Sequence, residues 1–258
     1  PAHGYAPRAL AVPALVGLVF LVLPLTALVA RVQWSTFLAD VTSQAALSAL
    51  LLSLGTGLVA TVVCIIVGVP LALYIARSGP RLAAVLRAVV TVPLVLPPMV
   101  GGVALLYLFG RAGWLGGLGL SFSTPAVVLA QTFVALPFLV LAVEGAVRTS
   151  GVDYERTAAA LGAGRWTILR RITLPLAAPG IVAGVVLCFA RAIGEFGATA
   201  LFAGNRPGVT QTMPLAIYTA FNGAGVSQGT AVALALLLLA TAIVVLLLVR
   251  GGRPGVTR

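Results

Sequence analysis

Side chains that could perform chemistry are scarce in this chain of 258 residues. It holds sixteen arginines, no lysine, five acidic residues and a single histidine, His3. An active site buried in so apolar a chain would need a nucleophile with its base, or paired carboxylates. His3 stands in the N-terminal tail, and both aspartates, Asp40 and Asp153, stand between apolar runs. The sequence therefore predicts a subunit without catalytic residues, and no metal-ligand set is expected.

Arg191 and Glu195 are the one pair of opposite charges inside an apolar run. A spacing of four residues places both side chains on one helix face. Charge within a membrane is costly and needs a partner or water. Two interpretations stay open: mutual neutralisation near a subunit interface, or a gate or transient anion contact at Arg191. Glu144 is expected to pair with Arg148, one turn further along its helix.

The composition predicts that these residues belong to an all-α membrane protein. Hydrophobic residues make up 60% of the chain, charged residues only 8%, and the mean hydropathy is +1.14. A soluble domain carries about a quarter of charged residues. A membrane-spanning helix needs about 20 mostly apolar residues. Six windows of the chain qualify, and they form one transmembrane domain over residues 1–258: about 10–30, 46–76, 88–109, 125–147, 176–203 and 227–249.

The arginines are distributed unevenly between the two sides of these windows. If the first window runs outward from the cytoplasm, twelve arginines fall inside and three, Arg31, Arg111 and Arg206, fall outside. Because cytoplasmic loops carry the excess of positive charge, both termini are predicted to be cytoplasmic. The net charge of +11 does not come with a nucleic-acid-binding module. Membrane lipid, and not nucleic acid, is therefore the expected environment.

The third window contains three prolines and two glycines between residues 93 and 102. Such irregular backbone is tolerated at membrane depth where protein or a water-filled cavity covers it. Pro97, Pro98, Met99 and Gly101 are thus candidates for lining a translocation path. The alternative, which stays open, is close helix packing through Gly101 and Gly102.

The segment 148–175 combines charge with apolar residues between two predicted spans. Asp153 and Glu155 near its start and Arg165 further along suit a short helix, because acids favour the N-terminus and bases the C-terminus. Gly162 and Gly164 should break it into two short helices. A solvated loop would explain the arginines but not the apolar stripe of Ile168, Leu169, Ile172 and Leu174. We therefore predict a cytoplasmic docking element.

This segment resembles the cytoplasmic signature of the permease subunits of ABC importers. That signature reads Glu-Ala-Ala, three residues, Gly, nine residues, Ile, one residue and Leu-Pro. Arg156 and Thr157 occupy the positions of its Glu and first Ala, and Glu155 stands one residue early. The resemblance implies a coupling helix that docks in a groove of a cytoplasmic ATPase. The coupling residues it implies are Asp153, Glu155, Ala158, Ala159, Gly162, Arg165, Ile172, Leu174 and Pro175.

A narrower resemblance covers residues 190–199, 203–208 and 210–219, which are similar to the molybdate and tungstate permeases. It implies a type I importer fold in a prokaryotic cytoplasmic (inner) membrane and a homodimer. The implied partners are two ATPase subunits, which use ATP and Mg, and an external oxyanion-binding protein; this subunit binds no cofactor. A sulfate or thiosulfate ABC permease and a secondary transporter are the alternatives. Further path candidates are Arg191, Glu195 and Thr199, and external-mouth candidates are Asn205, Thr210, Gln211 and Thr212.

The stretch 209–222 is predicted to form a short helix lying flat at the outer membrane surface. Its apolar content favours a helix, and Pro214 suits a first turn. About fourteen residues are too few to span a bilayer. The helix would then cap the outward mouth.

Overall fold

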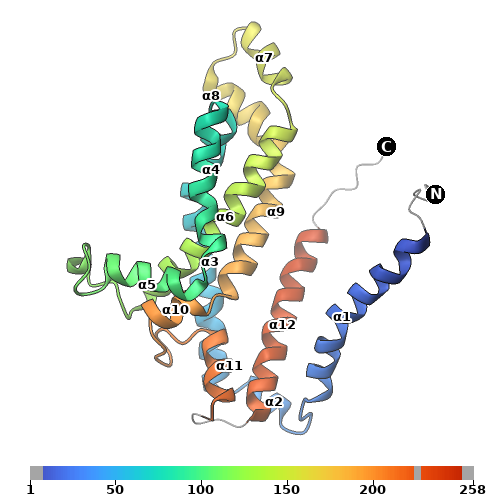
Figure 1. Cartoon of the computed structure of the whole chain (residues 1–258), viewed down its shortest axis with the longest axis vertical. Helices are drawn as coiled ribbons and strands as arrows, with labels where there is room; N and C mark the ends of the chain where they lie inside the picture. Colours follow the sequence, from blue (N-terminus) through green and yellow to red (C-terminus); the bar gives the residue numbers. More distant parts are fainter. Residues whose placement is uncertain (1–7, 224–227, 252–258) are drawn as a thin grey trace.

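The computed structural model describes residues 8–223 and 228–251, and this part of the chain contains helices and connecting turns but no strand (Figure 1). The described elements are η1 (Arg8–Leu10), α1 (Ala11–Ala30), α2 (Phe37–Val41), α3 (Gln44–Arg77), α4 (Pro80–Val95), α5 (Pro98–Phe109), η2 (Gly116–Leu118), α6 (Thr124–Thr149), α7 (Asp153–Ala160), α8 (Arg165–Ile168), the π-helical turn η3 (Leu169–Thr173), α9 (Leu174–Ile193), α10 (Gly197–Phe202), α11 (Met213–Phe221) and α12 (Gln228–Gly251).

Four helices in the described residues are long and apolar enough to cross a membrane. They are α1, α3, α6 and the continuous helix Arg165–Ile193, which includes α8, η3 and α9. The bent pair of α4 and α5 would be a fifth crossing, and α12 contributes another apolar helix of 24 residues. At about 1.5 Å per residue, the 34 residues of α3 extend well beyond a hydrocarbon core about 30 Å thick.

The centre of the fold is a bundle of α3, α6 and α9 that packs through small residues. Its core is rich in alanine and valine, with the thiols of Cys64 and Cys188 buried among them. A Cβ atom built on Gly180 of α9 would stand 2.2 Å from the Cβ of Ala146 on α6. Small side chains thus let the helix backbones approach closely, as membrane helices favour.

The third predicted window does not form one straight helix. The chain bends by 109° between α4 and α5, at Leu96 and Pro97. Pro97 and Pro98 lack backbone N–H groups, and a residue that precedes proline is pushed out of the α region. As a result α5 leaves the bundle sideways (Figure 1). The predicted window 88–109 therefore corresponds to a helix that starts earlier, at Pro80, and then turns.

The fifth predicted window, 176–203, is also divided. The helix that starts at Arg165 ends at Ile193, and α10 begins at Gly197. Helix α10 packs on α5 through small residues: a Cβ atom on Gly102 would stand 2.9 Å from the Cα of Ala198. Helices α5 and α10 therefore form a layer that projects from one side of the bundle near its middle (Figure 1).

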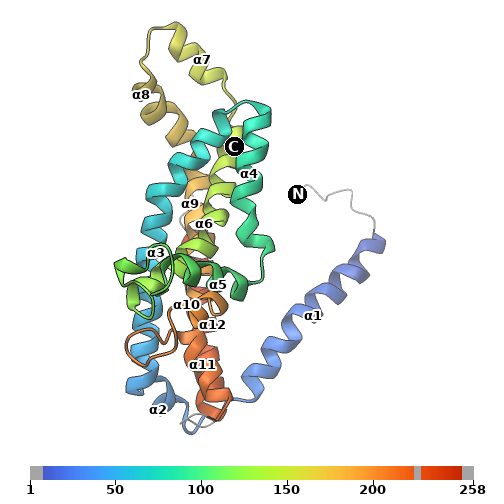
Figure 2. The same cartoon turned by 60° about the vertical axis from the view of Figure 1, so that its left-hand side comes forward.

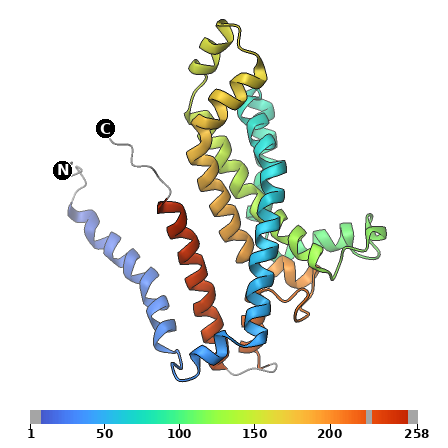
Figure 3. The same cartoon turned by 180° about the vertical axis from the view of Figure 1, so that it is seen from behind.

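Helix α1 stands apart from this bundle (Figures 2 and 3), and α12 lies between the bundle and α1 (Figure 3). None of the residues of α1 is buried. The Ala11 end of α1 and the Gly251 end of α12 point toward the side of the molecule on which α7 lies, and α2 lies at the opposite end (Figure 1).

Helix α11 confirms a short helix within the predicted stretch 209–222, but it begins only at Met213, with Pro214 in its first turn, and ends at Phe221. The structure differs from the prediction in its orientation, because α11 runs along the bundle next to α12 and the start of α3 (Figure 1). The reason is packing: Met213 and Ala216 are buried against Ala46 of α3 and Leu234 of α12. A helix with protein on two sides does not need the membrane surface to cover its apolar face.

Candidate functional site

The segment after α6 projects from one end of the bundle as two short helices, α7 and α8 (Figure 1). Helix α7 has eight residues and ends at Ala160; Gly162, two residues further on, has a φ of +86°, in the left-handed region that favours glycine. The chain becomes helical again after Gly164. The predicted break at Gly162 and Gly164 is therefore confirmed, but only α7 is a separate short helix, because α8 continues into the long helix Arg165–Ile193.

This segment presents large apolar side chains to its surroundings. Leu161 is 84% exposed, and Tyr154 and Trp166 are each 68% exposed. The guanidinium of Arg170 lies 5.1 Å from the centre of the Trp166 ring. Large exposed apolar residues in a segment that projects from the bundle mark an interaction surface. Of the predicted coupling residues, the exposed ones are Asp153, Ala159, Gly162, Arg165 and Pro175, and the half-buried ones are Glu155, Ala158, Ile172 and Leu174.

Glu155 is held by the membrane domain. Arg77, the last residue of α3, donates a hydrogen bond to its Oε1 atom, and the hydroxyl of Thr173 in η3 donates to the same oxygen at 2.7 Å. We call these three residues the coupling clasp. The sequence placed Glu155 among the coupling residues but did not identify Arg77 or Thr173. The two partners lie 78 and 18 residues away, so no local spacing could have identified them.

A second network joins α4 to α6 below the coupling clasp. The Nε atom of Arg87 donates to Oε2 of Glu144 at 3.1 Å, and its Nη2 donates to Oε1. Nη1 of Arg148 lies 3.4 Å from the same Oε1. The side chain of Glu144 is only 4% exposed. The predicted pair of Glu144 and Arg148 is confirmed, but Arg87, which the sequence analysis missed, is the closer partner.

Arg191 and Glu195 form the predicted pair at the far end of α9. Nη2 of Arg191 lies 2.7 Å from Oε2 of Glu195, whose side chain is 1% exposed. The other oxygen, Oε1, accepts a hydrogen bond from the backbone N–H of Ala198 at 2.8 Å. Glu195 therefore accepts a backbone N–H group from the first turn of α10 and also neutralises Arg191. The side chain of Arg191 keeps 26% of its surface exposed.

The remaining path candidates divide into exposed and buried residues. Pro97, Pro98 and Met99 are exposed at the bend, Met99 by 52%. Gly101 and Thr199 are buried within the subunit. A Cβ atom on Gly101 would stand 2.9 Å from the ring of Phe133. Gly101 is thus packed against another helix, as the alternative interpretation expected, and neither it nor Thr199 faces an open surface of the single subunit.

The external-mouth candidates are mostly engaged within the protein. Asn205 is exposed and donates a hydrogen bond to the hydroxyl of Thr219 at 2.8 Å, and Gln211 is half-buried. Thr210 and Thr212 are buried, which differs from the predicted open position. The hydroxyl of Thr210 accepts the backbone N–H of Arg206 at 2.9 Å and so closes a turn.

One buried polar residue escaped the sequence analysis. Gln131 of α6 is fully buried, and neither end of its amide finds a hydrogen-bond partner within the described residues. The hydroxyl of Thr199 is likewise without one there. The sequence held one signal that could have identified this residue: Gln131 is the single amide side chain of the fourth predicted span, residues 125–147.

Comparison with known proteins shows which family this chain belongs to. Residues 68–258 match the family of binding-protein-dependent transport system inner membrane components. The chain belongs to this family. It is therefore a multi-pass protein of the inner membrane and the membrane component of an ABC transport system.

Several relatives of this inner membrane component are similar over nearly its whole length. A molybdenum transport system permease protein, ModB, of Mycobacterium tuberculosis is 52% identical over 254 residues, which cover 96% of this chain and 95% of the relative. A probable molybdenum ABC transporter permease protein of Haloferax volcanii is 42% identical, with 92% and 87% covered. A chain of a bacterial ABC transporter that imports alginate has the same fold, with a TM-score of 0.68, 18% identity and coverage of 97% and 95%.

Proposed function

We propose that this chain is the membrane-spanning subunit of an ATP-driven molybdate importer that also accepts tungstate. The observation that carries the proposal is the 52% identity, over 96% of the chain, to a molybdenum transport permease. The stretches 190–199, 203–208 and 210–219, which resemble oxyanion permeases, lie in the matched part.

We further propose six membrane crossings with both termini in the cytoplasm. The four apolar helices, the bent pair and α12 supply the six. Arg77, Arg87 and Arg148 all lie at the end of the bundle from which α7 projects. By the positive-inside rule that end is cytoplasmic. Two copies would form the path, with the exposed Pro97, Pro98 and Met99 toward the partner copy.

In this assembly α7 and α8 dock on a cytoplasmic ATPase that uses ATP and Mg. The exposed Tyr154, Leu161 and Trp166 supply the apolar contact. Movement of α7 then reaches α3 and η3 through the coupling clasp. This subunit performs no chemistry; it converts a displacement at the cytoplasmic end into opening of the path.

The path itself is expected to hold the anion weakly. Arg191 lies in the last turn of α9, next to the α5 and α10 layer, and Glu195 already neutralises it. Tight capture of a divalent oxyanion needs several fixed donors, which is the task of an external binding protein. Selectivity therefore belongs to that partner, and the subunit acts as a conduit.

Uptake into proteoliposomes tests the proposal. The subunit would be reconstituted with its ATPase and binding protein, and uptake of labelled molybdate would be measured against excess tungstate or sulfate. We expect ATP-dependent uptake that tungstate suppresses and sulfate does not. Suppression by sulfate alone would assign the subunit to sulfate import. Uptake driven by an ion gradient without ATP would refute the proposed class.

A further inference from the structure

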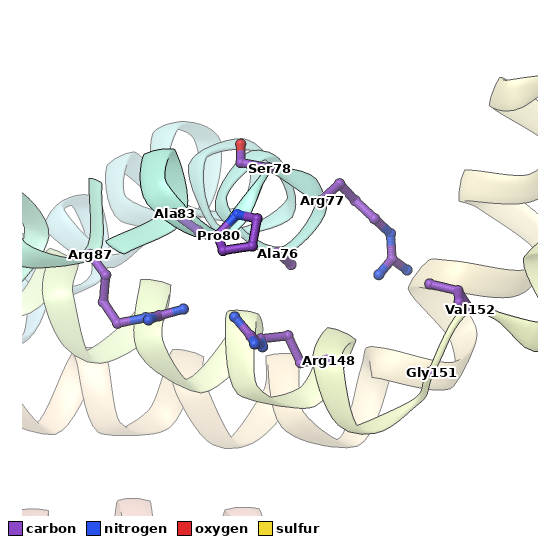
Figure 4. A pocket seen from close by; sticks show the side chains of 9 residues that line it. All are labelled: Ala76, Arg77, Ser78, Pro80, Ala83, Arg87, Arg148, Gly151 and Val152. Carbon is purple, nitrogen blue, oxygen red and sulfur yellow. The ribbon is translucent and has the colours of Figure 1, made fainter. Parts of the chain in front are cut away.

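A cavity at the coupling end of the bundle is lined by three arginines and by no carboxylate (Figure 4). Its volume is about 510 Å³. Arg77 comes from the end of α3, Arg87 from α4 and Arg148 from the last turn of α6, and Gly151 closes the side toward α7. We call it the arginine cavity. The Arg87 and Arg148 side chains extend toward each other across it (Figure 4).

Two buried or half-buried carboxylates hold these guanidinium groups without filling the cavity. Glu144 forms ion pairs with Arg87 and Arg148, and Glu155 forms one with Arg77. Three arginines facing two carboxylates leave a formal excess of one positive charge. Each guanidinium has five N–H groups, and the two hydrogen bonds from Arg87 to Glu144 use only two of them. Donors in a fixed geometry therefore remain for a further acceptor.

The start of α4 adds to this preference for an anion. Helix α4 begins with Pro80, which lines the cavity, and Gly79 before it provides no side-chain cap. The N–H groups of a first helical turn carry a partial positive charge and favour anions. The side chains of Arg87 and Arg148 are 38% and 57% exposed, so a ligand can reach them.

The depth of the cavity indicates where the anion comes from. Arg77 and Arg148 lie at the ends of two membrane-spanning helices, α3 and α6, on the side we assign to the cytoplasm. Lipid phosphates lie at this level, and basic pockets between helices on the cytoplasmic side recognise anionic headgroups. Guanidinium pairs match the oxygens of a phosphate group.

We propose that the arginine cavity is a binding site for a tetrahedral oxyanion, occupied by the headgroup phosphate of an anionic lipid of the inner leaflet. A free tetrahedral dianion, such as phosphate or molybdate, shares this chemistry and is the other possible source. The site lies away from the α5 and α10 layer and is separate from the transport path. It would lock α3, α4 and α6 together next to the coupling clasp.

Native mass spectrometry of the full-length subunit, stripped of lipid in detergent, tests the site. One arm titrates phosphatidylglycerol, and the other titrates free phosphate or molybdate. The test variant is Arg148→Gln, because Arg87 still pairs with Glu144 and the buried carboxylate is not left alone. The matched control is Arg81→Gln, which removes the same charge from an exposed residue that does not line the cavity. Arg148→Lys keeps the positive charge and therefore reports the contribution of charge apart from that of the guanidinium geometry.

One cationic contact at a membrane surface contributes about 1 kcal/mol, so we expect Arg148→Gln to weaken phosphatidylglycerol binding about fivefold. Arg81→Gln and Arg148→Lys should stay within about twofold of the unmodified subunit. If Arg148→Gln weakens only the binding of free anion, the ligand is soluble and the site stands. If Arg148→Gln and Arg81→Gln bind phosphatidylglycerol equally well and also bind the free anion equally well, the proposal is overturned. Weaker binding of the ATPase with both anion arms unchanged would also overturn it, and would assign the cavity to the protein interface.

Discussion

Replacing Glu155 with alanine should uncouple ATP hydrolysis from transport by releasing α7 from the membrane domain. The substitution removes the ion pair with Arg77 and the hydrogen bond from Thr173, which are the two side-chain contacts of the coupling clasp. A helix of eight residues is marginal by itself in water, so α7 depends on such contacts to stay formed. The sequence around it would be unchanged, and only its anchoring would be lost.

The size of the effect follows from the exposure of the two partners. The side chain of Arg77 is 33% exposed and that of Glu155 is 19% exposed, so solvent screens the ion pair and it contributes about 1 kcal/mol at most. A hydrogen bond to a charged acceptor adds about 1.5 kcal/mol. Allowing for screening, the clasp contributes roughly 2 kcal/mol, or about a thirtyfold change in the population of anchored α7.

Hydrogen exchange of the assembled complex is the direct assay. The amides of Arg156 and Leu161, which bond within the helix at 2.9 and 3.1 Å, should exchange about thirtyfold faster in Glu155→Ala. The ratio of ions transported to ATP hydrolysed should fall in proteoliposomes. The matched control is Thr157→Ala, because the hydroxyl of this exposed residue bonds only to the Asp153 carbonyl of its own helix. In that variant the amide exchange rates and the ratio of ions transported to ATP hydrolysed should stay within about twofold of those of the unmodified subunit.

A double-mutant cycle decides whether the clasp is the cause. Arg77→Ala should reproduce part of the effect, and adding it to Glu155→Ala should change little more, since the shared contact is already lost. Exchanging the two charges, Arg77→Glu with Glu155→Arg, should restore part of the protection. Fully additive effects, or exchange rates in Glu155→Ala equal to those of Thr157→Ala, would refute the reasoning.

Two other substitutions have a definite expected result. Gly162→Val forces a side chain into a φ of +86°, which costs about 1–2 kcal/mol. This variant should stimulate the ATPase less, with no loss of folded protein. Its control is Gly164→Ala, which should be tolerated because Gly164 has a φ of −68° and open space around it. Gly180→Ala places a Cβ atom 2.2 Å from that of Ala146 and should destabilise the fold by about 1–3 kcal/mol. The purified subunit should therefore melt at a lower temperature. Its control is Gly145→Ala, which should leave the melting temperature unchanged because no atom lies within 4 Å of the added Cβ. Normal stimulation in the first case, or an unchanged melting temperature in the second, would contradict the packing described.

Hydropathy predicted the helices well and their breaks poorly. The apolar windows account for α1, α3, α6 and α12, because a span must satisfy its own backbone and therefore has to be a long apolar helix. Composition alone does not fix the direction of the chain after a break. Pro97 and Pro98 indicated irregular backbone, but the bend of 109° depends on the packing of α5 against α10. The orientation of α11 likewise depends on contacts with helices far away in sequence.

The charged pairs show the same limit more sharply. Both pairs with a spacing of four residues, Glu144 with Arg148 and Arg191 with Glu195, could be predicted because helix geometry brings such residues together. The pairs that join separate helices could not. Arg87 lies 57 residues from Glu144, and its partner becomes known only when α4 and α6 are placed side by side. Gln131 was missed for a related reason, because its burial and missing partners are properties of the packed bundle.

The position of these pairs also says how movement can pass through the subunit. The helix Arg165–Ile193 is continuous over 29 residues, so it connects the docking segment with the α5 and α10 layer over about 43 Å. At its first end Thr173 contacts Glu155, and beyond its last residue Glu195 holds the first turn of α10. Small residues pack it tightly against α6, and tightly packed interfaces move as units instead of deforming gradually. A displacement of α7 that acts on this helix should therefore reach α10 and the bend at α5, and in the exchange experiment its signature is altered protection of the Ala198 amide in Glu155→Ala.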